Sequence, residues 1–434
     1  MKRIVAAVVL AALAASATLA QAPTIAELKG KSVQISLWTH EDPNRMLIER
    51  KYIDEFMAAN PGVKVDYVTT PSSKIWEKLT TAFAANQGPD IFNVVITSAV
   101  SFIENGRVAP VNYKTVGTKN AAGYEDRYLP GMLDPVLSEG DFYGMPLEIT
   151  NMCVYLNRKM FRDAGLDPDK DYPKTWEEVM AVSEKIAKRD GQILTRRGFD
   201  FRYDGYLTTV VPMVEQLGGE LVSKDGKEVI ANDAAWLKVL QYLKDYGPNG
   251  KNLGSPTYAA ARTQFDLNKD QVAMSLSGLY QEARMKASNP AFYNSKDWMV
   301  IPFPHWKDAK RRVTANYSGH YYMVNAQSAK LEQLAAWALV NWMLSHGEEY
   351  LSSVAIVQPT KALFESPTYT SMPYSKVFEK DFDASKIVYI GKISSRINNF
   401  LKEAFESVML GGIEPTKALE KLRKDCKAYL AENP

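Results

Sequence analysis

The sequence has few of the residues from which metal centres and nucleophilic active sites are built. It holds two cysteines and four histidines in 434 residues, and the histidines are scattered without metal-ligand spacing, at His40, His305, His320 and His346. No zinc-protease motif, phosphate-binding loop or nucleophile elbow occurs. We therefore expect no metal, no cofactor and no catalytic residues.

The two cysteines, Cys153 and Cys426, could form a disulfide in an oxidising compartment. Cys153, however, lies in the apolar, strand-like run 152–155. Free cysteines are among the most buried residue types in proteins. We therefore predict two buried free thiols.

Long apolar runs are also missing, apart from one at the N-terminus. Lys2 and Arg3 precede an apolar run at 4–15, which is shorter than the roughly 20 residues of a membrane-spanning helix. Small side chains then supply a signal-peptidase site. The pattern predicts a signal peptide at 1–20 and a mature periplasmic monomer that starts at Gln21. Because no cysteine follows the cleavage point, we expect no lipid anchor.

Charge of neither sign dominates the chain. The formal net charge is +2, and losing Lys2 and Arg3, two positive charges, with the signal peptide brings it to 0. A nucleic-acid-binding domain needs a net basic face. We therefore expect no nucleic-acid partner.

What the sequence does contain is a repeated strand–helix pattern. Hydrophobic periodicity predicts strands at 32–38, 63–67 and 91–96, with helices between them at 45–59 and from 72 or 73. Short connections between alternating strands and helices indicate parallel strands with right-handed crossovers. Later strands are expected at 142–147, 152–156, 272–276 and 321–324, and later helices at 175–188, 328–345, 394–410 and 415–430. The mature chain is longer than one core usually holds, so we predict an α/β fold with two domains.

Several short motifs follow one another along the mature chain. They are Ile35-Ser36-Leu37-Trp38, Asn60-Pro61-Gly62-Val63, Gly88-Pro89-Asp90-Ile91, Tyr143-Gly144-Met145-Pro146, Val154-Tyr155-Leu156-Asn157, Pro173-Lys174-Thr175-Trp176, Leu217-Gly218-Gly219, Gly278-Leu279-Tyr280 and Leu334-Ala335-Ala336-Trp337. In this order they resemble the extracellular solute-binding protein family 1, the maltose-binding-protein-like group. The family usually has Gly-Pro-Trp where this chain has Gly278-Leu279-Tyr280, which leaves the size and identity of the ligand open.

The resemblance implies a two-lobed periplasmic-binding-protein-like fold (type II), in which a multi-strand hinge joins two α/β lobes. It also implies a non-enzymatic component of an ABC importer, which captures a sugar or oligosaccharide between the lobes and delivers it to permease subunits in the inner membrane. The lobes are expected at 21–147 plus 303–352 (N-terminal) and at 148–302 plus 353–434 (C-terminal). The crossings between them are expected at 147–151, near Pro302 and at 353–358.

Candidate ligand-binding residues lie where such sheets bind ligands, beyond the carboxyl ends of strands, and at the expected crossings. Trp38 and Tyr280 offer ring faces for a pyranose, and carboxylates such as Glu41 accept two hydroxyl hydrogens at once. Together with the positions that the resemblance suggests, the candidates are Trp38, His40, Glu41, Asp42, Thr97, Ser98, Glu148, Thr150, Tyr206, Tyr280, Tyr317, His320 and Arg396.

Structural roles compete with binding at several of these positions. Glu41 and Asp42 could only cap the helix that follows them, and Thr97 and Ser98 could do the same for the next one. Arg396 could pair with an acidic neighbour instead of an anionic ligand. Trp38 could pack in the core, and core packing is the role that we predict for Trp76.

Other functions also stay open. A secreted glycoside hydrolase or lyase needs paired carboxylates, for which Glu41, Asp42 and Glu148 are candidates, but the family resemblance favours a binding protein. Among ligands, sugar acids, glycerol phosphates and polyamines are alternatives to the neutral sugar that we favour.

Overall fold

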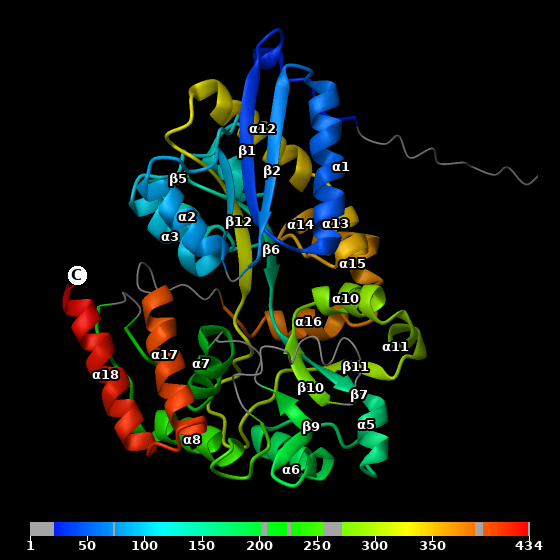
Figure 1. Cartoon of the computed structure of the whole chain (residues 1–434), viewed down its shortest axis with the longest axis vertical. Helices are drawn as coiled ribbons and strands as arrows, with labels where there is room; N and C mark the ends of the chain where they lie inside the picture. Colours follow the sequence, from blue (N-terminus) through cyan, green and yellow to red (C-terminus); the bar gives the residue numbers. More distant parts are fainter. Residues whose placement is uncertain are drawn as a thin grey trace, which may run out of the picture.

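The computed structural model describes residues 21–72, 74–200, 206–223, 227–254, 271–386 and 394–432. Two α/β lobes, each built on a five-stranded mixed sheet, lie one above the other in Figure 1. The predicted signal peptide lies outside the described residues. Within them, no helix combines the length and the apolar composition that a bilayer crossing requires.

The first lobe is built on a sheet with the strand order β2-β1-β3-β12-β6. Strand β1 is parallel to β2 and β3, whereas β12 is antiparallel to both of its neighbours. The strands are β1 (Val33–His40), β2 (Val63–Thr70), β3 (Ile91–Val95), β6 (Met145–Thr150) and β12 (Ser318–Val324). The main helices are α1 (Pro43–Ala59), α2 (Ile75–Ala84), α3 (Ile96–Glu104) and α12 (Lys330–Leu344).

Alternation of buried and less buried side chains fixes the orientation of β1. Val33, Ile35 and Leu37 are buried, and the residues between them are not. The strand runs two residues beyond the predicted end and stops at His40. Helix α1 then starts at once, because the Asp42 side chain accepts hydrogen bonds from the Asn44 and Arg45 backbone amides, both at 3.1 Å.

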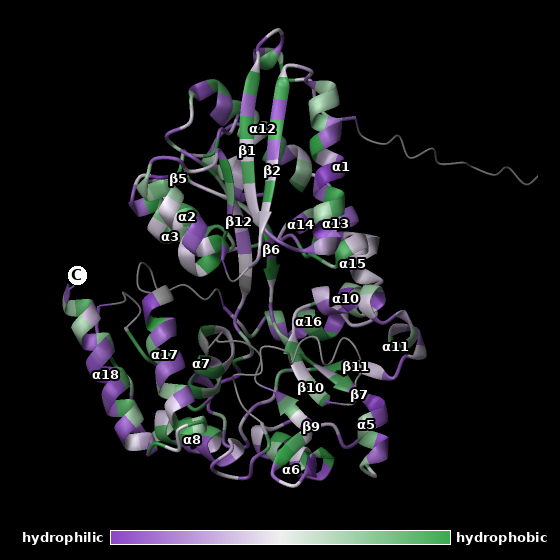
Figure 2. Ribbon diagram, viewed as in Figure 1, coloured by the Kyte–Doolittle hydropathy of each residue, from purple (hydrophilic) through white to green (hydrophobic). Residues whose placement is uncertain are grey.

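The second lobe is built on a sheet with the order β11-β7-β10-β9-β8. Its strands are β7 (Cys153–Asn157), β8 (Lys188–Asp190), β9 (Ile193–Asp200), β10 (Val272–Ser277) and β11 (Trp298–Ile301). Its main helices are α5 (Arg158–Asp163), α6 (Trp176–Ile186), α7 (Tyr206–Gln216), α8 (Asp233–Tyr246), α17 (Ser394–Met409) and α18 (Pro415–Glu432). Helix α6 starts where the sequence predicts it, because Thr175 and Glu178 form a capping box there. Figure 2 shows hydrophobic residues in the strands of both lobes and mixed residues along the outer helices.

Shorter elements complete the described chain. A third hydrophobic cluster, which includes Tyr155, Met285, Trp298, Leu351 and Phe378, joins several of them to β7 and β11. The remaining elements are η1 (Ala26–Leu28), α4 (Ala121–Glu125), η2 (Asp134–Val136), β4 (Leu137–Ser138), β5 (Asp141–Phe142), α10 (Tyr280–Ser288), α11 (Pro290–Ser295), α13 (Gly347–Val354), α14 (Lys361–Glu365), α15 (Pro367–Thr370) and α16 (Ser375–Phe382).

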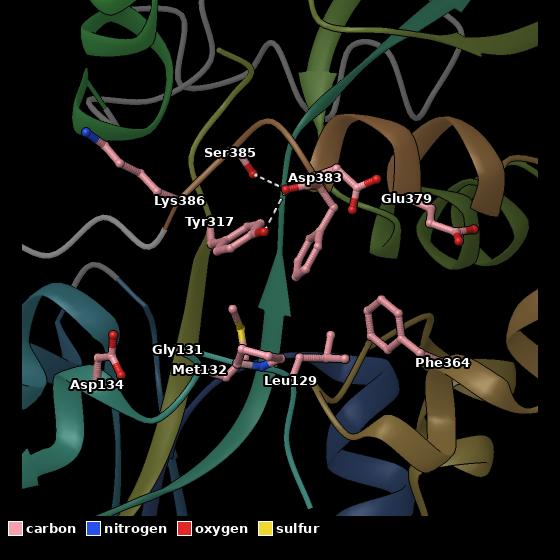
Figure 3. Close-up of a pocket in the computed structure, with 12 residues that line it drawn as sticks. Leu129, Gly131, Met132, Asp134, Tyr317, Phe364, Glu379, Asp383, Ser385 and Lys386 are labelled. Atoms are coloured by element: carbon pink, nitrogen blue, oxygen red, sulfur yellow. Dashed lines mark hydrogen bonds between the residues drawn. The ribbon is translucent and has the colours of Figure 1, made fainter. Parts of the chain in front are cut away.

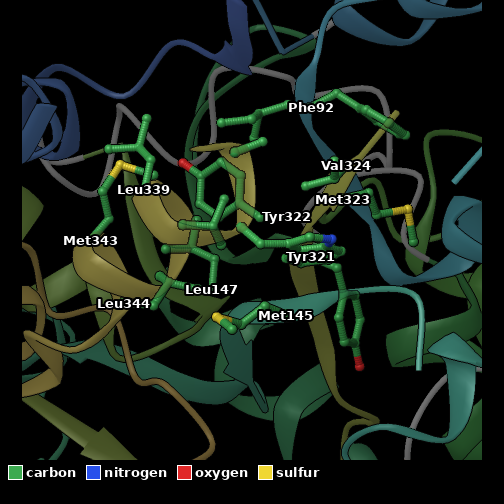
Figure 4. Packing of buried hydrophobic residues seen from close by; sticks show 14 of the residues in the cluster. Phe92, Met145, Leu147, Tyr321, Tyr322, Met323, Val324, Leu339, Met343 and Leu344 are labelled. Carbon is green, nitrogen blue, oxygen red and sulfur yellow. The ribbon is translucent and has the colours of Figure 1, made fainter. Parts of the chain in front are cut away.

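Core packing differs from the expected lobe boundaries. Figure 4 shows part of the core of the first lobe. After Ile149, the next residue along the chain that belongs to this core is Tyr317. Phe303 and Trp306 instead pack in the core of the second lobe, with ring centroids 5.2 Å from Trp176 and Tyr242, respectively. The crossing expected near Pro302 therefore lies about fifteen residues later along the chain, because these two large rings fill the second core.

Two further boundary differences are smaller. β6 keeps residues 148–150 in the sheet of the first lobe, and Val354 and Ile356 pack in its core. The thiol prediction is confirmed, since Cys153 and Cys426 are both buried and free.

Candidate functional site

The strands β1 and β2 of the first sheet end on the side that faces the second lobe (Figure 1). Three polar side chains meet at this end of the sheet. β1 ends there at His40, and the strand register pairs His320 of β12 with Glu148 of β6. A Cβ atom on Gly319 would lie 2.0 Å from the Glu148 carbonyl oxygen, so only glycine allows these two strands to approach so closely. We call His40, His320 and Glu148 the edge cluster.

The edge cluster is compact and partly buried. The rings of His40 and His320 lie 4.4 Å apart between centroids, with 30° between their planes. His320 Nε2 lies 3.8 Å from Glu148 Oε1, which is too long for a hydrogen bond. Within the described residues, the buried Nδ1 of His320 has no hydrogen-bond partner. His320 therefore keeps hydrogen-bonding capacity that the described part of the protein does not use.

Burial favours the uncharged forms of Glu148 and His320. It raises the pKa of Glu148 to about 7; Arg45 opposes this rise and Asp42 adds to it. Burial, together with the nearby Arg45 cation, lowers the pKa of His320 to about 3. His320 is thus neutral at neutral pH, and its approach to Glu148 is not a salt bridge. A neutral imidazole and a half-protonated carboxyl can each donate or accept a hydrogen bond.

The buried ion pair of Arg45 and Glu49 holds the end of β1, which carries His40. Arg45 Nη2 donates to Thr39 Oγ1 at 2.8 Å and to the His40 carbonyl oxygen at 2.6 Å. Arg45 and Glu49, one helical turn apart on α1, are both almost fully buried, with Nε and Oε1 3.5 Å apart. The Tyr67 hydroxyl donates to Glu49 at 2.6 Å, and so does the Tyr322 hydroxyl. Sequence reasoning missed Arg45, although its i,i+4 spacing to Glu49 was a signal.

The second lobe approaches the edge cluster through the turn between β10 and α10. A Cβ atom on Gly278 would lie 2.3 Å from Thr150 Oγ1 and 2.6 Å from the Tyr280 ring, so this turn touches the end of β6. The Arg284 guanidinium lies 5.1 Å from the centre of the Tyr280 ring and donates to Gln281 Oε1 at 3.2 Å. Gln281 is buried, and its Nε2 has no partner within the described residues. Sequence reasoning named Tyr280 here but neither Gln281 nor Arg284.

Four other candidates lie at or near the starts of α1 and α3, and only one of them caps a helix. Asp42 caps α1, as the alternative interpretation proposed. Thr97 and Ser98 lie in the first turn of α3, whose N-cap is Val95, so they do not cap it. Glu41 is exposed, and its backbone amide donates to the Thr70 carbonyl at 2.9 Å.

The aromatic and basic candidates are spread out. Trp38 is half-buried, with Lys78 Nζ 4.1 Å from the centre of its ring. Arg396 is exposed on α17, over the ring of Phe400 at 4.9 Å. Tyr206 begins α7, but its side chain and residues 202–205 lie outside the part of the chain whose side chains are described.

Tyr317, the residue immediately before β12, has different surroundings from His320. Its hydroxyl donates to the Phe382 carbonyl at 2.7 Å, and its ring stacks on Phe382 at 4.0 Å. A cavity of about 500 Å³ opens beside it between the two lobes (Figure 3). The cavity is lined by Leu129, Pro130, Gly131, Met132, Asp134, Tyr317, Phe364, Glu379, Phe382, Asp383, Ser385 and Lys386. It contains no member of the edge cluster.

The profile of the bacterial extracellular solute-binding proteins matches residues 43–350. The chain belongs to this family. Among relatives, this solute-binding protein is similar to a putative binding protein of Brucella abortus, with 24% identity over 311 residues that cover 64% of this chain and 72% of that protein. It is also similar to the diacetylchitobiose binding protein of Streptomyces coelicolor, with 24% identity over 249 residues that cover 57% of this chain and 55% of that one.

A solved structure has the same fold. A solute-binding protein of Thermotoga lettingae, bound with α-D-tagatose, superimposes with a TM-score of 0.79 at 18% identity and covers 92% of this chain and 100% of its own. The solute-binding protein described here therefore has the type II periplasmic-binding fold. Both the family and the fold class predicted from the motif order are confirmed. Among the described residues, no group of three or more metal-ligating side chains could hold a metal ion.

Proposed function

We propose that this solute-binding protein is the periplasmic component of an ABC importer and that it captures a sugar or oligosaccharide between its lobes. It passes the ligand to the permease subunits without changing it chemically. The observation that carries the proposal is the pairing of Glu148 and His320 in the edge cluster: both are partly buried, His320 is neutral, and its Nδ1 has no hydrogen-bond partner within the described residues.

Hydrogen bonding and charge both favour a neutral polyhydroxylated ligand. A buried polar group without a partner costs about 1–3 kcal/mol, and a ligand hydroxyl that bonds His320 Nδ1 removes that cost. Each sugar hydroxyl donates and accepts, which matches a neutral imidazole beside a half-protonated carboxyl. A phosphate or carboxylate at the same place would lie against Glu148, which still ionises near neutral pH.

The relatives point to the same class of ligand. The Streptomyces coelicolor relative is a diacetylchitobiose binding protein, and a Pyrococcus abyssi relative is a maltotriose-binding protein. The described chain offers contacts from both lobes, His320 and Glu148 from the first and Tyr280 and Gln281 from the second. A ligand that touches both sets favours a closed arrangement of the lobes by its additional contacts there.

Titration calorimetry on the mature protein tests the proposal. The panel contains glucose, N-acetylglucosamine and arabinose, their oligomers up to four units, sn-glycerol 3-phosphate, glucuronate and putrescine. We expect at least one sugar series to bind, with an affinity that hardly changes between low and high salt. Tight, salt-sensitive binding of a charged compound, with no sugar bound, would contradict the proposal.

Variants locate the site and test for catalysis. Glu148→Leu should abolish most of the sugar affinity, whereas Glu420→Gln, an exposed carboxylate on α18, should leave it unchanged. Overnight incubation should return the oligosaccharides intact by chromatography. Cleaved product would show an enzyme and overturn the proposal.

A further inference from the structure

One tryptophan, Trp76, is exposed on the first lobe. Trp76 has 41% of its surface exposed, and among the large apolar side chains that are exposed in the described chain it is the only aromatic one. Sequence reasoning expected it to pack in the core. An exposed indole offers an apolar face on which the C–H side of a sugar ring can lie.

The position of Trp76 links it to the binding edge of the first sheet. β2 ends at Thr70, and Trp76 lies in the first turn of α2, which starts at Ile75. β1 is parallel to β2, so the end of β2 lies at the same sheet edge as His40. The first turn of α2 therefore emerges at the edge where the edge cluster lies.

The Trp76 ring packs against a buried aromatic cluster. It makes an edge-to-face contact with Phe102 of α3, with centroids 5.4 Å apart and planes at 83°. Phe102 in turn packs against Phe83 and Phe92, with centroids 5.1 and 5.0 Å away. A rigid ring loses little conformational freedom when a ligand stacks on it, which makes Trp76 suitable as a platform.

The other tryptophan of this surface is already covered. Lys78 Nζ lies 4.1 Å from the centre of the Trp38 ring and 3.4 Å from Thr70 Oγ1. One face of Trp38 is thus occupied by a cation, and its ring is half-buried. The stacking role that the sequence assigned to Trp38 therefore suits Trp76 better.

The surface that carries Trp76 also faces the second lobe. Helix α3, which supports the Trp76 ring through Phe102, contacts α17 of the second lobe. α17 presents Arg396, an exposed side chain with five hydrogen-bond donors, from the opposite lobe. An aromatic face on one lobe and hydrogen-bond donors on the other are the two components of a sugar-binding surface.

We propose that Trp76 is the platform of an outer subsite, on which a second sugar ring stacks while the first ring contacts the edge cluster. The inference rests on the proposed function and narrows the ligand class to neutral oligosaccharides of two or more rings. The apolar C–H face of the second ring covers the indole, and its hydroxyls remain at the rim, within reach of the opposite lobe.

The test compares chain lengths within the sugar series that the calorimetric panel identifies. For the wild type, the disaccharide should bind at least about tenfold more tightly than the monosaccharide. Trp76→Ala should remove most of this gain, a loss of about tenfold for the disaccharide, and should leave monosaccharide affinity within about twofold. Trp76→Phe, which keeps a ring against Phe102, should fall between the two.

Leu47→Ala provides the matched control, because Leu47 is an exposed apolar residue (74%) on α1. It should leave every affinity unchanged. Thermal unfolding of each variant should stay within a few degrees of the wild type, since an exposed ring contributes little to the core.

Three outcomes would overturn the subsite, and they have different meanings. A wild type that gains nothing from a second ring, or a Trp76→Ala variant that keeps the gain, shows that Trp76 does not contact the ligand. Unchanged affinities with impaired uptake through the permease place Trp76 at a protein contact instead. A wild type that binds no sugar at all refutes the proposed function, and the subsite with it.

Discussion

His320 and Tyr317 lie three residues apart on either side of the start of β12, yet they face different surroundings. At His320, the side-chain Nδ1 is buried without a partner within the described residues, and the pKa falls to about 3. At Tyr317, the hydroxyl bonds the Phe382 carbonyl at 2.7 Å and the ring stacks on Phe382. His320 keeps a ring nitrogen available for a hydrogen bond, whereas the Tyr317 hydroxyl already has a partner within the protein.

Cavity volume alone would place the ligand site beside Tyr317 rather than at His320. The cavity of about 500 Å³ lies on the Tyr317 side and has a volume typical of ligand sites. Its Tyr317 wall, however, is already satisfied by internal contacts, whereas the edge cluster is braced by the buried Arg45–Glu49 pair and left incomplete. The comparison explains why we place the proposed sugar site at the edge cluster, where hydrogen bonding is unmet, rather than at the larger cavity.

The largest effect should come from removing the support of the edge cluster. Arg45→Met leaves the Glu49 carboxylate buried without its cation, which costs roughly 3–5 kcal/mol. It also frees the His40 carbonyl, so sugar binding should disappear. Urea unfolding measures the first effect. Lys51→Met, which breaks the more exposed pair with Glu349, should cost at most about 1 kcal/mol; an equal loss in both variants would contradict the buried support.

A second effect concerns pH and Glu148. Its folded pKa of about 7 exceeds the unfolded value of 4.5, so the folded protein holds this proton more tightly. The free energy of unfolding should therefore fall as pH rises from about 4.5 to about 7, by on the order of 3 kcal/mol from this group. Glu148→Gln should flatten the curve over that range in urea unfolding at successive pH values. A slope identical to that of the wild type would show that Glu148 is solvated.

His320 should have the opposite pH dependence. Its folded pKa of about 3 lies below the unfolded value of 6.5, so its contribution to stability is complete above pH 6.5 and is lost as pH falls towards 3. His320→Gln should reduce the acid sensitivity of unfolding. The same variant should weaken sugar binding by about tenfold through the lost imidazole bond. Unchanged affinity would remove His320 from the site.

The smallest effect should come from Tyr317. Tyr317→Phe removes the hydrogen bond to the Phe382 carbonyl and should lower stability by about 1 kcal/mol, while the stacked ring remains. Calorimetry should find the sugar affinity of this variant unchanged. A loss of sugar affinity as large as that of His320→Gln would mean that Tyr317 also takes part in binding.

Local sequence patterns determined most of the fold. Periodicity located β1, α1, β2 and β3, and the Thr175–Glu178 pair located the start of α6, because these features depend on neighbours within a few residues. The return of the chain to the first lobe was placed too early. The burial of Phe303 and Trp306 depends on partners such as Trp176 and Tyr242, which are far away in the sequence.

For the candidate site, too, the sequence suggested individual residues, and the tertiary structure decided which of them lie together. The residue types of His40, Glu148 and His320 at strand ends and at a crossing were enough to propose each as a candidate. Only the strand register brings His320 opposite Glu148, and only the tertiary structure shows that the Tyr317 hydroxyl bonds the Phe382 carbonyl. Likewise, no local pattern shows that Lys78 covers Trp38 while Trp76 stays exposed, because exposure is set by whatever packs on a side chain from elsewhere in the fold.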